Sequence, residues 1–367
     1  MHACLESDAA SEVTGAAQAL YARLIDRAYN THVNRLPETV VTLYAELLDQ
    51  CVHADAEQRA SLAGGSFVSK TVRDATYWYF QQTSGSEKRQ TYLGRETPAL
   101  LAWMNESASA RAERRTDEQR RRELVRMLVA GGVKRTPAPV TQVLTVLAEA
   151  GIFRSGGVLA GTQAYACYAP MLGVRLEERF LQTADIDIAI DVALPDEKAA
   201  DVPAALKKIE PRFFAVPELD PGSPSTSFKV RGRDLRVDFL TTRRRRGNEA
   251  PVPLPHFRVA ATPLPGIDYL IEQPVQAVVA GGSGLLVNVP APARFAFHKL
   301  WVARERPASE QAKARKDLAQ AQELLAILAE DRPDDVEDAW RALATRSSMK
   351  RRVGVAALPE SVRSLLR

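Results

Sequence analysis

The chain is poor in cysteine and has no long uninterrupted apolar segment. Its 367 residues contain three scattered cysteines, Cys4, Cys51 and Cys167. This usage predicts neither a disulfide framework nor a zinc site with paired cysteine spacing. No stretch approaches the ~20 apolar residues of a membrane helix, and acidic residues and serine interrupt the N-terminus, unlike a signal peptide. We therefore expect a chain that works in the reducing cytoplasm without membrane contact.

A strong excess of one charge is also lacking, because the formal net charge is only +4. The total by itself does not indicate a nucleic-acid partner, but the distribution is uneven. Residues 97–130 predict a long helix in which arginine outnumbers acidic residues. Such a run is typical of a solvated helix with i,i+4 ion pairs. The arginine excess equally suits contact with RNA, and the sequence leaves both interpretations open.

The length of the chain predicts two or three domains. Gly131-Gly132 and Pro137–Pro139 mark a linker between elements. The predicted regions are a helical N-terminal part with a β segment at 64–94 and the basic helix (1–135), an α/β core (136–290) and a helical C-terminal part (291–367).

Three short strands are predicted within residues 64–94, from FVSKTV, TYWYFQQ and KRQTYLG. Alternation places Tyr77 and Tyr79 on one face and Trp78 and Phe80 on the other. Aromatic side chains on a sheet with basic neighbours can stack bases and hold phosphates. A three-stranded sheet also needs an apolar face simply to be stable, so the aromatics have two possible purposes.

The most informative stretch begins with an apolar run that enters a glycine. Val158–Ala160 predicts a buried strand, and Gly161 permits a tight turn and close approach of a ligand to the backbone. Thr162 then opens a predicted helix over Gln163–Leu172. The free N–H groups and the dipole at the start of that helix favour phosphate.

Three aspartates follow on predicted strands. Asp185 and Asp187 share one strand face, while Ile186, Ile188 and Ile190 occupy the other and can be buried. Asp238 lies in the apolar run LRVDFL, a poor place for a carboxylate unless it is paired or binds metal. Such carboxylates can bind a pair of divalent cations that clamp the attacking and leaving oxygens of a phosphoryl transfer.

Gly161-Thr162, the Asp-Ile-Asp strand and the later strand aspartate together resemble the polymerase-β-like nucleotidyltransferase superfamily. The sequence is most similar to a bacterial branch of nucleotidyltransferase-like proteins, through the segments VLAGTQAYACYAPMLGV, TADIDIAI, LRVDFLT and PARFAFHKL followed by KARKDLAQA. The resemblance implies an α/β (α+β) core with a small mixed sheet and helices on one side. An accessory N-terminal α+β region and a C-terminal helical region would complete this fold.

The resemblance also implies an activity, the transfer of a nucleoside monophosphate from an NTP such as ATP to an acceptor hydroxyl. Asp185, Asp187 and Asp238 would hold two Mg²⁺ ions, with Mn²⁺ as an alternative, and Gly161 and Thr162 would hold the terminal phosphates. RNA, including a tRNA 3′ end, is the favoured acceptor because it suits the basic helix and the aromatic strands. A protein hydroxyl or a small molecule stays open.

A more distant similarity links the C-terminal part to abortive-infection nucleotidyltransferases, which carry a helical lysine and a later Lys/Arg-Asp pair in the cleft. The matching residues are Lys299, on a predicted helix over Pro292–Ala303, and Lys316 with Asp317, which open the next predicted helix. The alternative is a structural ion pair between the two helices. This kinship also leaves room for a cognate antitoxin or regulator.

Two further segments carry expectations about structure. The spacing from Gly161 to Asp185 is longer than the superfamily usually shows, so residues 169–183 are expected to cover the site or contact the substrate. Residues 247–265 are rich in proline and are expected to be irregular. Two other functional classes remain open: a non-enzymatic nucleic-acid-binding protein that uses residues 64–130, and an NTP-binding pseudoenzyme.

Overall fold

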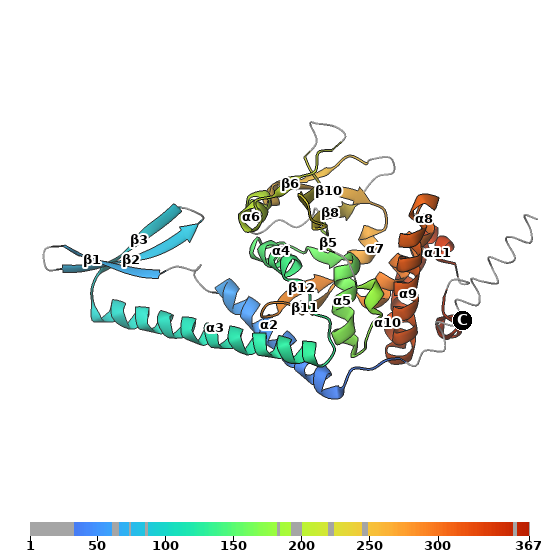
Figure 1. The fold of residues 1–367 in the computed structure, drawn as a ribbon, viewed down its shortest axis with the longest axis horizontal. Helices are drawn as coiled ribbons and strands as arrows, with labels where there is room; N and C mark the ends of the chain where they lie inside the picture. The colour runs from blue at the N-terminus through green and yellow to red at the C-terminus, as the bar shows by residue number, and fades with distance from the viewer. Residues whose placement is uncertain are drawn as a thin grey trace, which may run out of the picture.

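The computed structural model shows two sheets at opposite ends of a long helix. It describes residues 33–60, 66–72, 75–84, 87–181, 184–191, 200–218, 224–243, 249–354 and 358–366. Figure 1 shows a mixed sheet surrounded by helices, and a separate three-stranded sheet that projects from the far end of the helix. This arrangement confirms the predicted mixed α/β fold class. No helix in the described part of the chain combines the length and apolar character needed to cross a bilayer.

The larger sheet has seven strands with mixed pairing. Its main path runs in the order β4 (Val158–Ala160), β5 (Asp185–Ala189), β8 (Arg236–Thr242), β10 (Val259–Leu264) and β9 (Val252–Leu254). β5, β8 and β10 are mutually parallel, whereas β4 and β9 run antiparallel to their neighbours. On the edge of β8 away from β5, the first half pairs with β7 (Ser227–Val230), which in turn pairs with β6 (Phe213–Ala215). β8 is therefore the centre of the sheet.

Alternation along the two central strands separates an apolar face from a charged face, as predicted. Ile186 and Ile188 of β5 are fully buried, and so are Val237 and Phe239 of β8. The aspartates of both strands occupy the opposite face. The apolar face anchors the two strands against the core and thereby fixes where the carboxylates lie.

The expectation of an irregular segment over residues 247–265 is wrong. Part of it forms β9 and β10, joined by a short 3₁₀ turn at Pro255–Phe257. Pro253 lies in β9, the edge strand, where a missing N–H costs least. β10 is held by its pairing with β8 and by burial of Ala260 and Ala261, and neither contact is visible in the local composition.

Two packed helices form the largest part of the C-terminal region. These are α8 (Pro292–Glu305) and α9 (Gln311–Asp331). α9 begins at Gln311, earlier than the predicted opening at Lys316-Asp317. Its stripe of Leu324, Leu325 and Leu328 is fully buried.

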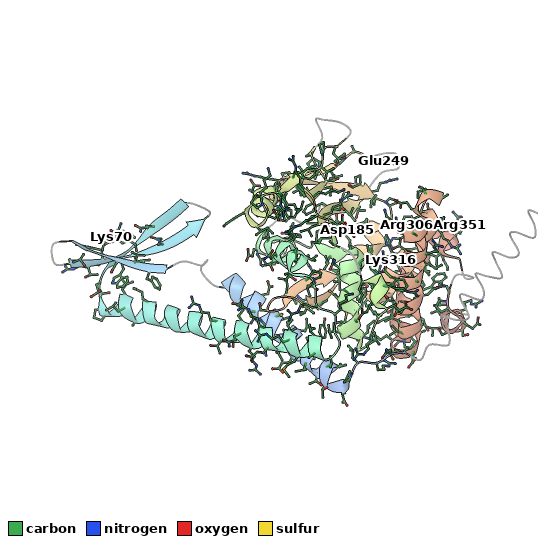
Figure 2. All side chains as sticks on the ribbon, in the orientation of Figure 1. Lys70, Asp185, Glu249, Arg306, Lys316 and Arg351 are labelled. Carbon is green, nitrogen blue, oxygen red and sulfur yellow. The ribbon has the colours of Figure 1, made fainter. Side chains whose placement is uncertain are left out.

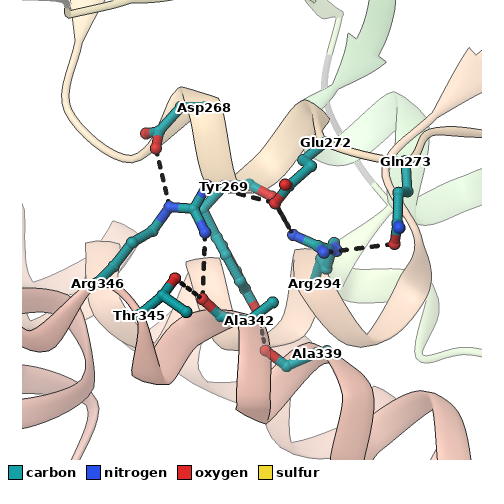
Figure 3. A network of polar contacts seen from close by, with 9 residues as sticks. All are labelled: Asp268, Tyr269, Glu272, Gln273, Arg294, Ala339, Ala342, Thr345 and Arg346. Carbon is teal, nitrogen blue, oxygen red and sulfur yellow. Dashed lines mark hydrogen bonds and ion pairs between the residues drawn. The ribbon is translucent and has the colours of Figure 1, made fainter.

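A polar network joins the following helices to the core (Figure 3). It connects α7 (Ile267–Ile271) to α8 and α10 (Pro333–Ala344), while α11 (Ser347–Val353) and α12 (Glu360–Leu365) complete the chain. The Tyr269 hydroxyl donates to the Ala339 carbonyl at 2.9 Å. The Arg294 guanidinium, itself buried, lies 2.7 Å from a carboxylate oxygen of Glu272. Arg346 pairs with Asp268 at 2.9 Å on the other side of the network.

The N-terminal helices are attached by a second core to the seven-stranded sheet and its surrounding helices, which we call the body. This core joins α2 (Glu38–Ala60), the C-terminal part of α3 (Pro98–Ala130) and the hairpin of β11 (Val275–Val279) and β12 (Leu285–Val289). Leu47 and Leu128 are fully buried in it, and the Val278 N–H donates to the Tyr44 hydroxyl at 3.2 Å. The helix pattern predicted before residue 33 lies outside the described residues, and the division at residue 135 stays a prediction.

The three predicted strands of residues 64–94 are confirmed as an antiparallel sheet. They are β1 (Ser66–Val72), β2 (Ala75–Ser84) and β3 (Glu87–Arg95), in that order. The Thr97 side chain accepts from the Leu100 N–H at 3.2 Å and caps α3 directly after β3. The long helix therefore carries this sheet at its N-terminal end, away from the larger sheet (Figure 1).

Candidate active site

The turn from β4 into α5 (Gly161–Leu172) has room only for glycine. Gly161 has a φ of 61°, in the left-handed region that favours glycine. A Cβ at this position would lie 2.0 Å from Asp187 Oδ2. The first turn of α5 has no side-chain cap, and Thr162 lies within it, half-buried. Backbone N–H groups at such a helix start are suited to bind an anion beside the Asp187 carboxylate.

Asp187 and Asp238 are brought together by the pairing of β5 with β8. In this parallel ladder Asp187 lies opposite Asp238, and Asp185 lies opposite Arg236. Register partners on adjacent strands project to the same face, with neighbouring strands about 4.8 Å apart. Carboxylates that are far apart in sequence thus become close neighbours.

The surroundings of Asp187 disfavour its charge in the absence of a cation. Burial and the charge of Asp238 raise the pKa of Asp187 to about 6, and Asp185 adds to the effect. Lys299 and Arg236 act in the opposite direction without cancelling it. Adjacent carboxylates that repel each other in this way are suited to share a cation.

Arg236 is a site residue that the sequence reasoning missed. Its Nε lies 2.7 Å from Asp238 Oδ1 and also donates to the Ser227 hydroxyl at 2.9 Å. Arg236 precedes Asp238 by two residues on the same strand, so strand alternation alone could have placed it on the carboxylate face. Its guanidinium balances the Asp238 charge in the protein without ligands.

Lys299 and Asp317 form the ion pair between helices that the sequence left open. Lys299 Nζ lies 2.5 Å from Asp317 Oδ1, and Arg306 Nε lies 2.7 Å from Asp317 Oδ2. The Asp317 side chain is buried; burial opposes its charge, but the two cations hold the pKa of the carboxyl below its ordinary value. Arg306 was not anticipated. Asp317 therefore anchors Lys299 in place.

The charges of two lysines act on the aspartates of the sheet or are acted on by them. The charge of Lys299 acts on Asp187, and that of Asp185 acts on Lys316. Burial and the neighbouring Lys299 lower the pKa of Lys316. Figure 2 labels Asp185 and Lys316 within the same body, with Lys70 at the distant end of the molecule. The site thus has a carboxylate side on the sheet and a cationic side on α8 and α9.

The carboxylates have the chemistry to provide part of a cation site. In the described ranges, no group of three or more Cys, His, Asp or Glu side chains is arranged to hold a metal ion. Asp187 and Asp238 nonetheless offer adjacent oxygens with mutual repulsion, and Asp185 shares their strand face. Mg²⁺ takes oxygen ligands and is usually bound by one or two carboxylates together with substrate phosphates and water. These donors fit Mg²⁺ when a nucleotide supplies the remaining oxygens.

The insertion of residues 169–183 runs beside α9 in its described part, which ends at residue 181. The Glu177 N–H donates to Glu323 Oε1 at 3.0 Å, and the Gln320 amide donates to the Phe180 carbonyl at 3.2 Å. The insertion, α5, α9 and residues 132–135 line a cavity of about 1110 Å³. The Tyr165 hydroxyl donates to Glu323 at its edge.

Cys167 and His298 lie near the site residues in sequence but are parts of the core. Cys167 is buried on α5, and its thiol donates to the Gln163 carbonyl. His298 is buried on α8, and burial lowers its pKa to about 3. Four arginines follow β8 at positions 243–246. Of these only Arg243 is among the described residues, and it lies 3.4 Å from Glu249.

Comparison with known proteins gives one finding about family. A family model described as a nucleotidyltransferase matches residues 138–345. No curated protein and no solved structure matches the chain. The matched residues begin at α4 (Ala138–Glu149), cover more than half of the 367 residues and contain every site residue described above. The sheet of β1–β3 and the helix α3 lie outside the match.

Proposed function

The chain belongs to a nucleotidyltransferase family, and from this premise we propose that it moves a nucleoside monophosphate from an NTP to an acceptor hydroxyl in a metal-dependent reaction. The acceptor oxygen forms a bond to the α-phosphorus. The bond from that phosphorus to the oxygen bridging to the β-phosphate breaks, pyrophosphate leaves, and the hydroxyl proton passes to solvent. The observation that carries the proposal is the position of Asp187 opposite Asp238, beside the glycine turn.

The carboxylate side would bind the cations. Asp185, Asp187 and Asp238 would hold Mg²⁺ or Mn²⁺, which when bound neutralises phosphate charge and activates the acceptor oxygen. Arg236 would keep Asp238 oriented before the nucleotide arrives, since it contacts the same carboxylate. Positioning and electrostatics supply most of the rate enhancement in such reactions.

The cationic side would bind the triphosphate. The N–H groups at the start of α5, with Gly161 and Thr162, would receive the terminal phosphates. Lys299 and Lys316 would neutralise their charge. Asp317 would act through Lys299, because its carboxylate is already occupied by Lys299 and Arg306.

RNA, for example a tRNA 3′ end, is the acceptor we favour. Exposed arginines line α3 on the approach to the body, including Arg115, Arg120, Arg122 and Arg126. Arg120 and Arg122 also bind Glu46 and Glu118 at 2.7 and 2.6 Å, so part of this charge is balanced locally. Arginine retains its charge at all physiological pH values and suits phosphate contact.

Label transfer tests the reaction directly. The purified protein is incubated with Mg²⁺ or Mn²⁺ and each α-phosphate-labelled NTP, with and without bacterial RNA. Wild type should transfer label, Asp187→Ala should not, and Asp234→Ala, which alters an exposed aspartate of the β7–β8 turn, should behave as wild type. Asp187→Asn repeats the test with a side chain of the same shape.

The location of the label identifies the acceptor class. Label on RNA supports RNA as the acceptor, whereas label on the protein would indicate that the acceptor is a protein hydroxyl. Turnover retained in Asp187→Asn would overturn the proposed site. NTP binding without transfer to any acceptor would favour the pseudoenzyme, and salt-sensitive RNA binding without NTP binding would favour a non-enzymatic nucleic-acid-binding protein.

A further inference from the structure

One face of the β1–β3 sheet gathers three tyrosines beneath a lysine. The Tyr92 ring centroid lies 5.4 Å from that of Tyr79 and 6.4 Å from that of Tyr77. Lys70 Nζ lies 4.8 Å from the centroid of the Tyr79 ring. The strand register explains this arrangement, since Lys70 lies opposite Tyr77 and Tyr79 lies opposite Tyr92. We call these four residues the tyrosine face.

The tyrosine face is open to solvent. Tyr92 is 56% exposed, and no described side chain of β1–β3 is buried on either face. A role in core packing would require these rings to be fully covered, whereas Tyr92 is exposed and Tyr77 and Tyr79 are only half-buried. Stabilising the sheet is therefore not a sufficient reason for three tyrosines on this face, because much of their ring surface remains exposed.

Hydrogen bonds hold the lysine over the rings. Lys70 Nζ donates to Gln90 Oε1 at 2.9 Å, and the Gln90 amide donates to Gln81 Oε1 at 2.8 Å. This chain crosses all three strands on the same face as the tyrosines. The side chains of Lys70, Gln90 and Gln81 are thus held in place beside the tyrosine rings. This arrangement suits a ligand that has both aromatic rings and charged groups.

The charge of this face is positive. Arg95 lies opposite Tyr77 and is exposed, so it adds a second cation near Lys70. Among the described side chains of the face, none is acidic. The nearby Glu96 is engaged by the opposite face, where the Trp78 indole N–H donates to it at 2.9 Å. The chemistry that complements such a face is a polyanion with exposed rings.

We propose that the tyrosine face binds an unpaired segment of RNA by stacking its bases on Tyr77, Tyr79 and Tyr92, with phosphates near Lys70 and Arg95. Stacking on aromatic side chains tolerates any sequence, and basic neighbours track the backbone. This inference rests on the proposed function only in taking RNA as the acceptor.

The distance between the tyrosine face and the candidate active site indicates how large an RNA must be to contact both. α3 has 33 residues, which corresponds to roughly 50 Å of helix. The tyrosine face lies at the far end of α3 from the candidate active site (Figures 1 and 2). A single nucleotide cannot contact both, so the face would hold a folded RNA at a distance from the end that receives the nucleotide.

Equilibrium binding tests the proposal without any transfer reaction. The full chain is titrated, without NTP, into a fluorescent single-stranded RNA oligonucleotide and into the same strand annealed to its complement. The single strand should bind more tightly. Tyr79→Ala and Tyr92→Ala should each weaken its binding by about fivefold to a hundredfold. Lys70→Gln should lower the slope of log K against log salt by about 0.7.

Matched variants separate stacking from folding. Tyr79→Phe and Tyr92→Phe retain the ring and should bind as wild type, whereas Tyr92→Leu retains only apolar volume and should not. Ser69→Ala changes an exposed residue on the opposite face and should have no effect. Circular dichroism of each variant confirms that the sheet is present.

Three outcomes overturn the inference. These are unchanged binding in both tyrosine-to-alanine variants, equal affinity for duplex and single strand, and a dimer in light scattering that dissociates when Tyr92 is replaced. Because no NTP is present, failure of label transfer does not affect this test. Conversely, RNA binding that is unchanged in both tyrosine-to-alanine variants, together with label transfer to RNA, would remove the tyrosine face and leave the proposed function intact.

Discussion

The two sheets of this protein use the same strand alternation in opposite environments. In the seven-stranded sheet, Ile186, Ile188, Val237 and Phe239 are fully buried, and the carboxylates lie on the other face among cations. In the β1–β3 sheet, the described side chains are all half-buried or exposed. Burial is what gives the first sheet its unusual electrostatics. The second sheet keeps ordinary surface chemistry and is suited to reversible contact.

The two sheets also differ in how their charged side chains are balanced by neighbouring charges. In the body, two carboxylates of the candidate site have cationic partners: Asp238 has Arg236, and Asp317 has Lys299 and Arg306. On the tyrosine face, Lys70 is held by the neutral amide of Gln90 and its charge is left for a ligand. The body is therefore sensitive to single changes of charge or volume, and the outer sheet should tolerate them.

The largest expected effect comes from filling the glycine turn. Gly161→Ala would place a methyl group 2.0 Å from Asp187 Oδ2 and should reduce label transfer by about a hundredfold or more. Gly232→Ala is the matched control, because Gly232 also has positive φ (74°) but has nothing within 4 Å of the added Cβ.

Both glycine variants should lose about 1–2 kcal/mol of stability from the left-handed backbone, and only Gly161→Ala should lose activity. Denaturant titration and label transfer measure the two effects. Equal label transfer by the two variants would show that the close approach of residue 161 to Asp187 is not needed for activity.

A second effect, on stability and not on the approach to Asp187, is expected from breaking the buried ion pairs of α8 and α9. Asp317→Asn leaves Lys299 and Arg306 without their anion and should lower the free energy of unfolding by about 3–5 kcal/mol. Arg341→Ala removes the exposed partner of Glu337 and Asp338 on α10 and should cost about 1 kcal/mol or less. Urea titration of both variants checks the contrast, and similar losses would contradict it.

The smallest expected effect is the contribution of His298 to the pH dependence of the free energy of unfolding. Burial first, and then the charge of Lys299, lower the pKa of His298 to about 3, whereas the unfolded chain binds this proton near pH 6.5. The unfolded state therefore binds more protons between these values. Below pH 6.5 the folded state should lose up to about 1.4 kcal/mol per pH unit, with no contribution from this group above that pH.

Replacing His298 with leucine isolates this contribution. Stability at pH 7 and pH 5 is compared in wild type and His298→Leu by denaturant titration. The variant should lose less stability over this interval than wild type. An identical change in the two proteins would mean that His298 does not titrate as its burial requires.

Several features of the site could be predicted from the sequence because they are local. Alternation placed Asp185 and Asp187 on one strand face, and a glycine after an apolar run marked the turn into α5. Arg236 is equally local, because it lies two residues before Asp238 and strand alternation places both on one face.

Other features required the assembled fold. The sequence leaves an ion pair of Lys299 with Asp317 as one of two alternatives, and the choice of Arg306 as a second partner depends on how α8 packs on α9. The prolines of residues 247–265 predict an irregular segment, yet β10 lies within it and is held by β8. Local composition does not report contacts made by a distant strand.

The sequence by itself determined the apolar and charged faces of the strands, the glycine turn and the aromatic alternation of the outer sheet, because side-chain period and backbone freedom are properties of neighbouring residues. Only the tertiary structure decided that Asp187 lies opposite Asp238 and that Lys299 faces them. Parallel strands have no local turn to set their register, so long-range packing sets it. The exposure of Tyr92 was likewise decided only when α3 placed its sheet away from the body.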